Sequence, residues 1–407
     1  MRKKLFLALL LCLTVVVQAQ SIWHEEVKRR LDVLMEDKLL ETAQLGMMFW
    51  DLTDDTLFYQ CHPRYLMRTA STMKALTAIA ALDCLGVDYQ LSTSLYYKGN
   101  IQNGVLSGDI ICVGGMDPLF DETDMNVFIS SLTQKGIKTL KGNIICDNSM
   151  RDDEKWGEGW CWDDKNPTLT PLLYGGKPGF GDQLMKGLRK AKVSVGGVRI
   201  VSGTLPEDAR LVCFRTHSIN QLLDQMMKES DNLYAECLYY QIAAHEAGRK
   251  AKAKHAQAYE KTLFSKIGLN ADDYRLADGS GLSLYNYLSP ACETMLMRYA
   301  WQQRDIFNHL LPSLPIAGVD GTLKKRMIGT SAEGNVKAKT GSVTGVSTLT
   351  GYLIASNGHL FCFSIMTQGL RRTAEGRLFQ DRVLVALTTP LGEDMQAIWS
   401  LLEEQGK

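Results

Sequence analysis

A serine and a lysine lie three residues apart in the segment Thr69-Ala-Ser-Thr-Met-Lys74, where the sequence predicts the start of a helix. Side chains at positions i and i+3 share one face of a helix, with Cβ atoms roughly 5–6 Å apart, so the amine of Lys74 can reach the hydroxyl of Ser71. A serine hydroxyl is a weak nucleophile until a neighbouring base takes its proton. A lysine can be that base when burial lowers its pKa and leaves part of it neutral. The pair predicts a nucleophilic serine activated by a lysine.

The residues after Lys74 support this helix. The run 75–82 is apolar and rich in strong helix formers, and Gly86 supplies a C-terminal stop. Apolar surroundings would also desolvate the amine. Taken alone, however, Ser-x-x-Lys matches arise often by chance, and the same residues also fit a serine N-cap followed by a surface lysine.

Two further motifs follow in the chain, Ser230-Asp-Asn232 and Lys339-Thr-Gly341. The order Ser-x-x-Lys, Ser-Asp-Asn, Lys-Thr-Gly is the signature of class A β-lactamases and penicillin-binding proteins. The segment Ser218-Ile-Asn220 also fits Ser-x-Asn, but Ser218 precedes a periodic apolar run, so we predict that it N-caps a helix. Ser230 and Asn232 follow the end of that run, where an interhelical loop could present them to a cleft.

The chain resembles the D-alanyl-D-alanine carboxypeptidase/endopeptidases of the low-molecular-mass, class C penicillin-binding proteins, which are serine peptidases that trim peptidoglycan. This resemblance implies a DD-peptidase/β-lactamase-like α/β (α+β) fold, in which helices flank an antiparallel sheet beside an all-helical lobe. Two departures are modest: Thr69 stands where proline is common, and Ser342-Val343 replaces the more usual Thr-Leu. The blocks that carry the resemblance cover nearly the whole mature chain: 70–77, 114–119, 230–236, 278–283, 317–323 and 338–347.

The resemblance assigns catalytic roles to three residues. Ser71 would attack the carbonyl carbon between two D-alanines, with Lys74 as the general base. Ser230 would relay the proton to the leaving amine. A covalent acyl-enzyme would form as the terminal D-alanine departs.

The resemblance also assigns substrate-binding roles. Asn232 would hold the substrate amide and help to fix the general-base lysine. Lys339 and Thr340 would bind the terminal carboxylate, and Gly341 would let the strand backbone approach closely. The backbone N–H groups of Ser342 and of the nucleophile would form the oxyanion hole.

The length of this chain, 407 residues, predicts two or three domains. Roughly 150 positions separate Lys74 from Ser230, more than a helical lobe needs, and they contain strand-like and helical runs. We therefore predict an inserted α/β domain at 89–205, flanked by the two parts of a penicillin-binding domain at 20–88 and 206–407. Residues 1–19 are predicted to be a signal peptide.

That signal peptide has a basic start at Arg2-Lys-Lys4, an apolar stretch at 5–17 and a small-residue cleavage site at Val17-Gln-Ala19. The apolar stretch is too short for an ordinary spanning helix. Cys12 suggests a lipoprotein anchor instead, but Leu11 before it is not small, so cleavage after Ala19 is favoured. We predict an exported protein of the periplasm or cell envelope without an integral membrane segment.

Hydrophobic periodicity predicts the remaining elements. Asn357-Gly358 is a strong hairpin signal between two of the strands. We predict helices at 23–40, 125–135 and 373–387, and strands at 46–51, 56–60, 108–113, 142–146, 198–201, 348–354 and 359–365.

Charge and histidine placement exclude several function classes. Basic and acidic residues balance at 45 each, so bulk charge favours no nucleic-acid partner. The seven histidines are dispersed, and His245-Glu246 lacks a second histidine four positions after the first. We predict neither a metal site nor a cofactor.

Nine cysteines remain after removal of the signal peptide, which is unusual for an exported chain. Cys112, Cys146, Cys213 and Cys362 lie in strand-like apolar runs, where cysteine often acts as a small buried hydrophobe. We predict mostly free, buried thiols. Cys161 is the cysteine whose pairing we would check first.

Two features have no derived chemical role. The tryptophans Trp156, Trp160 and Trp162 are interpreted as core packing of a loop-rich module in preference to substrate stacking. The segment Asp278–Ser283 is a candidate cleft-wall loop.

These observations predict an exported serine-type D-Ala-D-Ala carboxypeptidase, with D,D-endopeptidase activity as an extension, acting on peptidoglycan stem peptides and acylated by β-lactam antibiotics. One alternative is a β-lactamase or esterase that uses the same acylation machinery. We find no Glu-x-x-x-Asn block between the second and third motifs that would position hydrolytic water in a class A β-lactamase. The other alternative is a non-catalytic, penicillin-sensing or envelope-binding module, against which the intact motifs argue.

Overall fold

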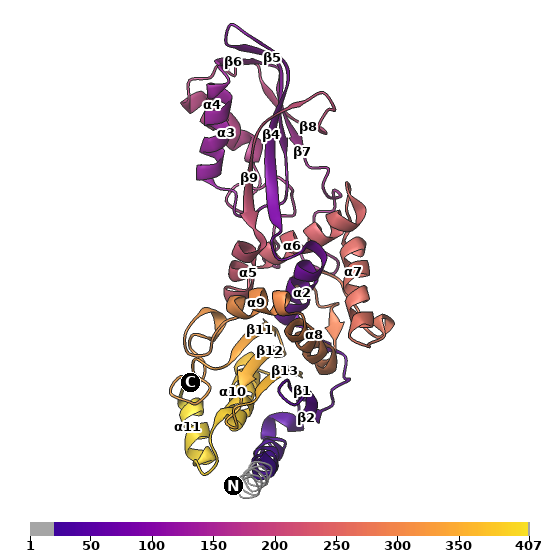
Figure 1. Cartoon of the computed structure of the whole chain (residues 1–407), viewed down its shortest axis with the longest axis vertical. Coiled ribbons are helices and arrows are strands. Elements are labelled where there is room, and N and C mark those ends of the chain that lie inside the picture. Colours follow the sequence, from indigo (N-terminus) through magenta and orange to yellow (C-terminus); the bar gives the residue numbers. More distant parts are fainter. Residues whose placement is uncertain (1–19, 406–407) are drawn as a thin grey trace, which may run out of the picture. The chain divides into compact units, whose positions relative to one another are not determined.

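The computed structural model describes residues 20–405, so the predicted signal peptide lies outside the described residues. The chain forms two compact units. Unit 1 comprises the chain up to Thr72, Tyr287–Gln302 and the chain from Leu314 onward, and unit 2 comprises Met73–Asn286 and Gln303–Ser313. Figure 1 colours the chain by residue number, from indigo near the N-terminus to yellow near the C-terminus.

Unit 1 is built on a five-stranded antiparallel sheet with the order β11-β12-β13-β1-β2. The predicted hairpin at Asn357-Gly358 is confirmed as β12–β13, and Gly358 in its turn has a φ of 86°. The strands predicted at 46–51 and 56–60 are confirmed as β1 and β2, which pair with each other. Strand β11, which carries the Lys-Thr-Gly motif, lies at the edge of the sheet. The strands are β1 (Gln44–Asp51), β2 (Thr56–Cys61), β11 (Lys337–Val343), β12 (Val346–Ile354) and β13 (Leu360–Gln368).

Helices cover both faces of this sheet. Tyr352 of β12 donates a hydrogen bond to Met297 O in α8 (Pro290–Gln302), whereas Ser347 of the same strand accepts one from Gln380 in α10 (Thr373–Thr388). These two strand residues have opposite parity, so their side chains point to opposite faces. Helices α8 and α10 therefore sandwich the sheet, which explains why nearly every residue of β12 and β13 is buried.

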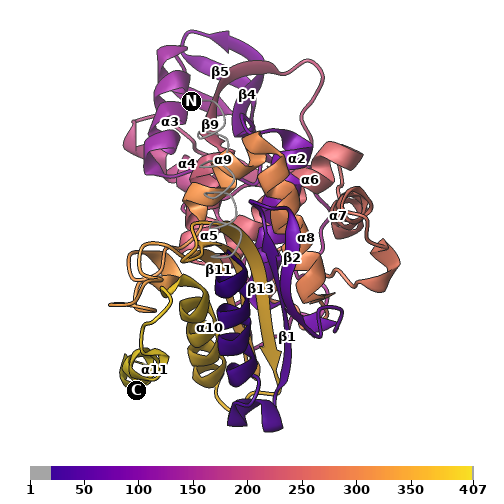
Figure 2. The same cartoon turned by 60° about the horizontal axis from the view of Figure 1, so that its bottom comes forward.

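The N-terminal helix, residues 20–34, lies beside α10 (Figure 2). The buried guanidinium of Arg30 donates hydrogen bonds to the carbonyls of Ala386 and Thr389 at 3.2 and 2.8 Å, which satisfies free carbonyls at the end of α10. The prediction of one helix to residue 40 is wrong. The helix ends at 34, and Asp37 N-caps a separate 3₁₀ turn, Lys38–Glu41, by accepting from Leu39 N.

Unit 2 contains a group of packed helices, α2 (Met73–Leu85), α5 (Ile219–Lys228), α6 (Asn232–Ala247), α7 (Ala253–Lys266) and α9 (Arg304–Ser313). Residues 73–82 of α2 are buried on every side. A helix that is apolar all round belongs in a core. The other helices of the group pack around it or around α6. The helix predicted after Ser218 is confirmed as α5, with Ser218 as its N-cap in a capping box.

Between α2 and α5 the chain forms a six-stranded mixed sheet. Strand β4 pairs antiparallel with β5 and β9, whereas β5, β7 and β8 pair in parallel. Helices α3 (Glu122–Gln134) and α4 (Phe180–Lys190) pack with it around a second apolar core. The strands are β4 (Gln90–Gln102), β5 (Val105–Val113), β6 (Thr139–Lys141), β7 (Asn143–Asp147), β8 (Arg199–Ser202) and β9 (Arg210–Ser218).

The predicted α/β fold class, an antiparallel sheet flanked by helices with additional helical and α/β parts, is confirmed. The domain boundaries at 89–205 stay a prediction. The nine cysteines of the described chain are free thiols, as predicted, but only four of them are buried: Cys112, Cys237, Cys292 and Cys362. Across residues 20–405, no helix combines the length and apolarity that a membrane span requires.

Candidate active site

Ser71 lies in a one-turn 3₁₀ helix, η2 (Ala70–Thr72), that leads directly into α2. The turn is anchored within unit 1. Thr72 Oγ1 lies 2.7 Å from Thr69 O and 2.6 Å from the buried carboxyl of Glu293, and Thr348 Oγ1 donates to Thr69 O at 2.7 Å. These contacts fix the backbone on both sides of Ser71.

The Lys-Thr-Gly strand passes closely against this turn. A Cβ added to Gly341 would lie 2.1 Å from Thr348 Oγ1, 2.8 Å from Thr69 O and 2.9 Å from the backbone N of Ser71. No side chain fits in that space, so glycine is required for the approach. Strand β11 and the backbone of Ser71 are therefore neighbours within unit 1.

The other residues of β11 have defined partners. Lys339 is fully buried and its Nζ donates to Thr340 O at 2.7 Å. The Thr340 hydroxyl donates to Thr322 Oγ1 at 2.7 Å, and Ser342 Oγ accepts from Arg377 Nη2 at 3.3 Å. Burial lowers the pKa of Arg377, and the nearby Arg326 adds to that effect.

Of these partners, Thr322 belongs to the block 317–323 that carried the family resemblance. Arg377 had no such signal, since it belongs to none of the motifs or family blocks and is one of two arginines on α10. Its place beside the strand comes only from the packing of that helix.

Lys74 is the second residue of α2 and belongs to unit 2. It is fully buried, and its Nζ donates to Asn232 Oδ1 and to Ser280 O, each at 2.7 Å. Burial lowers the pKa of Lys74 to about 8, while Asp278, Glu236 and Asp231 act to raise it. A substantial fraction of the amine is therefore neutral near physiological pH.

Ser230 and Asn232 lie at the junction of α5 and α6, as the sequence predicted. Asp231 N-caps α6 by accepting hydrogen bonds from the backbone N–H groups of residues 233 and 234. Asn232 is the first residue of the helix, and Ser230 holds a left-handed φ of 59°. Non-glycine residues adopt that conformation uncommonly, and strained backbone of this kind is frequent at functional sites.

The loop Asp278–Ser283 presents a carbonyl to Lys74. The buried carboxylate of Asp278 accepts from the backbone N–H groups of Gly281 and Ser283, each at 2.7 Å. It also accepts, at the same distance, from Asn286 Nδ2 and Trp160 Nε1. Four donors on one carboxylate hold the loop rigidly, so the loop acts as a support for the amine.

Two buried glutamates lie behind this loop, and neither was predicted. Glu236 accepts from the backbone N–H of Ser280 at 2.9 Å, and burial, together with the charge of Asp278, raises its pKa. Glu260 is fully buried, and within the described chain neither of its carboxyl oxygens has a hydrogen-bond partner. Burial raises the pKa of Glu260 well above its usual range, and the charges of Glu236 and Asp278 add to that effect.

The three tryptophans separate into two classes. Trp160 is 6% exposed and bonds to the Asp278 loop, so core packing is confirmed for this residue. Trp156 and Trp162 are 51% and 83% exposed, and the core interpretation is wrong for them. Both lie outside the regular helices and strands, and Trp162 is the more exposed of the two.

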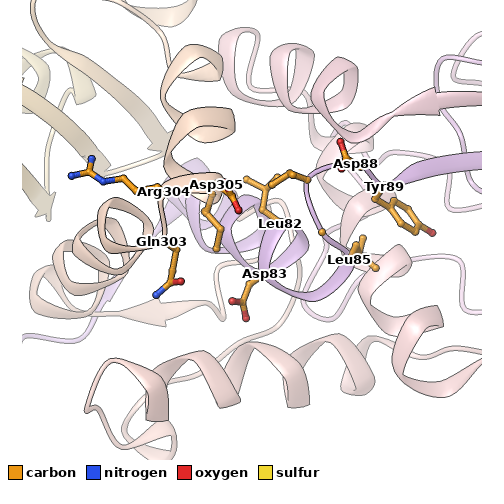
Figure 3. Close-up of a pocket in the computed structure, with 11 residues that line it drawn as sticks. Leu82, Asp83, Leu85, Asp88, Tyr89, Gln303, Arg304 and Asp305 are labelled. Atoms are coloured by element: carbon orange, nitrogen blue, oxygen red, sulfur yellow. The ribbon is translucent and has the colours of Figure 1, made fainter.

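A hollow of about 670 Å³ in unit 2 is separate from these motifs (Figure 3). It is lined by the last turn of α2, by Asp88 and Tyr89, and by the start of α9. Leu82 at its rim follows Lys74 by eight residues, or roughly 12 Å along the helix axis. The hollow therefore belongs to the opposite end of α2.

The predicted site residues therefore fall into two groups, one in each unit. Unit 1 places Ser71 beside the Lys339–Ser342 strand, and unit 2 places Lys74 against Asn232 and the Asp278 loop. Ser71 and Lys74 are joined by only two residues of continuous chain.

Comparison with known proteins identifies the family. The D-Ala-D-Ala carboxypeptidase 3 (S13) family matches residues 27–172 and 177–389. The chain is 25% identical over 414 residues to the D-alanyl-D-alanine carboxypeptidase DacB of Haemophilus influenzae, covering 81% of this chain and 86% of that protein. It is 26% identical over 450 residues to the D-alanyl-D-alanine carboxypeptidase of an Actinomadura species, covering 84% and 81% respectively.

The fold comparison agrees. The crystal structure of penicillin-binding protein 4 (dacB) from Haemophilus influenzae superposes with a TM-score of 0.78 at 23% identity, covering 92% of this chain and 99% of that one. The family match spans most of the chain, including the segments that hold all three motifs. The chain therefore belongs to the D-Ala-D-Ala carboxypeptidase 3 (S13) family of serine peptidases, the low-molecular-mass class C penicillin-binding proteins.

Proposed function

We propose that this serine-type D-Ala-D-Ala carboxypeptidase trims peptidoglycan stem peptides through an acyl-enzyme on Ser71. The observation that carries the assignment is the setting of Lys74, a fully buried amine with a lowered pKa three residues after that serine. At pH 7.5 roughly a quarter of a lysine with a pKa of about 8 is neutral and able to accept a proton.

In the proposed reaction, Lys74 takes the hydroxyl proton of Ser71 as Oγ bonds to the carbonyl carbon of the penultimate D-alanine. The C–N bond then breaks, and the leaving amine of the terminal D-alanine receives a proton through Ser230. Water hydrolyses the acyl-enzyme, which releases the shortened peptide and restores the serine. The backbone N–H groups of Ser71 and Ser342 stabilise the oxyanion, a role worth roughly 2.7–4 kcal/mol per donor.

The substrate carboxylate is assigned to the β11 strand. The Thr340 hydroxyl would turn its proton from Thr322 Oγ1 to the carboxylate, and the buried ammonium of Lys339, one residue away, supplies a positive field. The Oδ1 atom of Asn232 accepts a hydrogen bond from Lys74. Its Nδ2 amino group would therefore be the one that donates to the substrate amide. Gly341 keeps this strand close to the backbone of the nucleophile.

The proposal places the enzyme in the periplasm or cell envelope, after removal of residues 1–19 as a signal peptide. Peptidoglycan stem peptides are found there. β-Lactam antibiotics would acylate Ser71 because their strained amide and carboxylate resemble the D-Ala-D-Ala terminus.

The first test is the intact mass of the chain after incubation with benzylpenicillin. We expect wild type to gain one drug mass in a long-lived adduct and Ser71→Ala to gain none. The matched control is Ser107→Ala, which changes a serine of strand β5 in the six-stranded sheet. This variant should be acylated like wild type.

The alternatives give different outcomes in the same experiment. Rapid hydrolysis of the drug without a lasting adduct would identify a β-lactamase. No adduct, together with no release of D-alanine from a pentapeptide, would leave a non-catalytic binding module. Incubation with a cross-linked muropeptide dimer then measures endopeptidase activity separately from carboxypeptidase activity.

A further inference from the structure

Three potential metal ligands of different chemistry converge in unit 2. Cys84 comes from the last turn of α2, and His245 and Glu246 come from the last turn of α6. Cys84 Sγ lies 3.4 Å from His245 Nδ1 and 3.9 Å from Glu246 Oε1, and those two atoms are 3.3 Å apart. The thiol, imidazole and carboxylate therefore form one compact triangle.

This triangle has the dimensions of one face of a tetrahedral zinc site. Zinc bonds of about 2.3 Å to sulfur and about 2.0–2.2 Å to nitrogen and oxygen imply ligand-to-ligand separations of roughly 3.3–3.6 Å. Each of the three observed separations falls within about 0.3 Å of that range. A zinc ion could bind to all three atoms with very small side-chain movements.

The local electrostatics favour a cation. Helices α2 and α6 end at Leu85 and Ala247, so two negative ends of helix dipoles meet at this place. Asp83 lies one residue from Cys84, although the ammonium of Lys266 pairs with it. The side chains of His245 and Glu246 are 55% and 40% exposed, which gives an ion access from solvent.

We propose that Cys84, His245 and Glu246 bind Zn²⁺, with water as the fourth ligand. Thiolate and imidazole are poor ligands for Mg²⁺ or Ca²⁺ and good ones for zinc. On binding, the Cys84 thiol releases its proton to solvent. One thiolate and one carboxylate then neutralise the two positive charges of the ion.

The state of the thiol predicts how this site depends on pH. Zinc binds cysteine as the thiolate, and a free cysteine thiol has a pKa of about 8.5. The thiol is therefore protonated at neutral pH, and zinc must displace a proton. Zinc affinity should rise with pH, and binding should release about one proton.

The position of the site gives it a structural role. At the other ends of the same two helices, Lys74 Nζ donates to Asn232 Oδ1 at 2.7 Å. A zinc ion at Cys84 and His245 would clamp the C-terminal ends of α2 and α6 while this hydrogen bond joins their N-terminal ends. Because unfolding separates these ligands, bound zinc should raise Tm by a few degrees. This inference goes beyond the proposed reaction and does not depend on it.

The test uses the full mature chain, stripped with a chelator and titrated with zinc at neutral pH. We expect one equivalent of zinc per chain. With cobalt in place of zinc, we expect a thiolate-to-metal charge-transfer band. Cys84→Ser and His245→Ala should each lose the bound zinc, and Glu246→Gln should bind roughly tenfold more weakly.

Matched variants separate this site from other thiols and ligands. Cys161→Ser, which removes the exposed cysteine, should bind zinc like wild type. The described chain has a second group of potential metal ligands, formed by Asp51, Asp54 and His359. It offers only oxygen and nitrogen atoms, and the substitution His359→Ala removes its nitrogen ligand. Zinc that disappears in His359→Ala but persists in Cys84→Ser would overturn the proposal.

Absence of zinc binding by wild type at millimolar zinc would also overturn it, and the three side chains would then be a hydrogen-bonded helix cap. A cooperative thermal unfolding transition, followed by circular dichroism without added zinc, reports the folding of each variant. If Cys84→Ser does not fold, two other measurements test the site: the zinc affinity of Glu246→Gln and the thiolate-to-cobalt band of wild type. A cobalt complex without thiolate character excludes the site.

Discussion

The amine of Lys74 is subject to two opposing influences. Complete burial favours its neutral form, while Asp278, Glu236 and Asp231 favour the ammonium. A surface lysine would be almost wholly charged at neutral pH and useless as a base. The balance found here leaves the pKa at about 8, near the pH at which a general base is most effective.

We predict that acylation by benzylpenicillin becomes faster as pH rises through about 8, because the neutral amine is the base. Glu236→Gln keeps the acceptor for Ser280 N–H but removes a carboxyl group that raises the pKa of Lys74 when it is ionised; because the pKa of Glu236 is itself raised to about 8, the two groups titrate together in wild type. The midpoint of its pH–rate profile should therefore fall by roughly half a unit to one unit. The measurement is the acylation rate from about pH 6 to about pH 10.

Two comparison variants sharpen this experiment. Lys74→Met should slow acylation roughly 10²–10⁴-fold at every pH. Glu236→Ala leaves the N–H of Ser280 without its acceptor and should lower both the rate and Tm. Superimposable midpoints for wild type and Glu236→Gln would show that Glu236 does not influence the base.

At the scale of elements, the approach of β11 to the η2 turn requires Gly341. Gly341→Ala places a methyl group 2.1 Å from Thr348 Oγ1 and 2.9 Å from the Ser71 backbone N. We expect the strand to shift, at a cost of about 1–3 kcal/mol in stability, and acylation to slow at least tenfold. Acylation rate and Tm measure the two effects.

Gly196→Ala is the control for that substitution, since a Cβ there meets nothing within 4 Å. It should leave the acylation rate unchanged. A Gly341→Ala enzyme that acylates at the wild-type rate would mean that the contact between β11 and η2 is not needed for reactivity.

The loop that supports Lys74 depends on Trp160. Trp160→Phe keeps an aromatic ring but removes the N–H that bonds to Asp278 at 2.7 Å. We expect a loss of about 1–3 kcal/mol, seen as a lower Tm, and acylation slowed roughly tenfold. Trp162→Phe changes an indole that is 83% exposed and should alter neither quantity, so equal effects of the two variants would contradict this role.

At the scale of the whole molecule, neither unit is one continuous segment. The chain passes between units at Thr72–Met73, Asn286–Tyr287, Gln302–Gln303 and Ser313–Leu314. The first passage falls between the proposed nucleophile and its base. Each unit therefore requires segments far apart in sequence, and tests of stability and activity belong on the full chain.

Glu293 makes the stability of unit 1 depend on pH. Burial raises its pKa from 4.5 to about 7, opposed by hydrogen bonds with Thr72 and Ser364. The folded state therefore holds this proton more tightly than the unfolded state. The stabilisation is complete below about pH 4.5 and is lost as pH rises through about 7, by on the order of 3 kcal/mol.

We expect Glu293→Gln, which stays neutral, to remove this dependence. The Tm of the variant should rise relative to wild type between about pH 5 and about pH 9, by several degrees. Thermal unfolding at the two pH values measures the difference. A constant Tm difference would show that Glu293 does not lose a proton in the folded protein over this range.

The sequence by itself determined what local patterns encode. Three ordered motifs located the predicted site residues, and the Asn357-Gly358 turn and alternating apolar residues predicted the β12–β13 hairpin. Ser218 was distinguished from Ser230 because capping is decided within a few residues. The largest error in a helix boundary, at residue 34 instead of 40, is also local: Asp37 could cap a new turn.

Only the tertiary structure decided the surroundings of those residues. Trp160 reaches Asp278 across 118 positions, Lys74 reaches the Ser280 carbonyl across 206, and Cys84 meets His245 across 161. No spacing rule encodes such pairs, because packing brings them together after the local elements have formed. Burial likewise depends on what covers a residue, so the lowered pKa of Lys74 and the raised pKa of Glu260 became visible only in the folded chain.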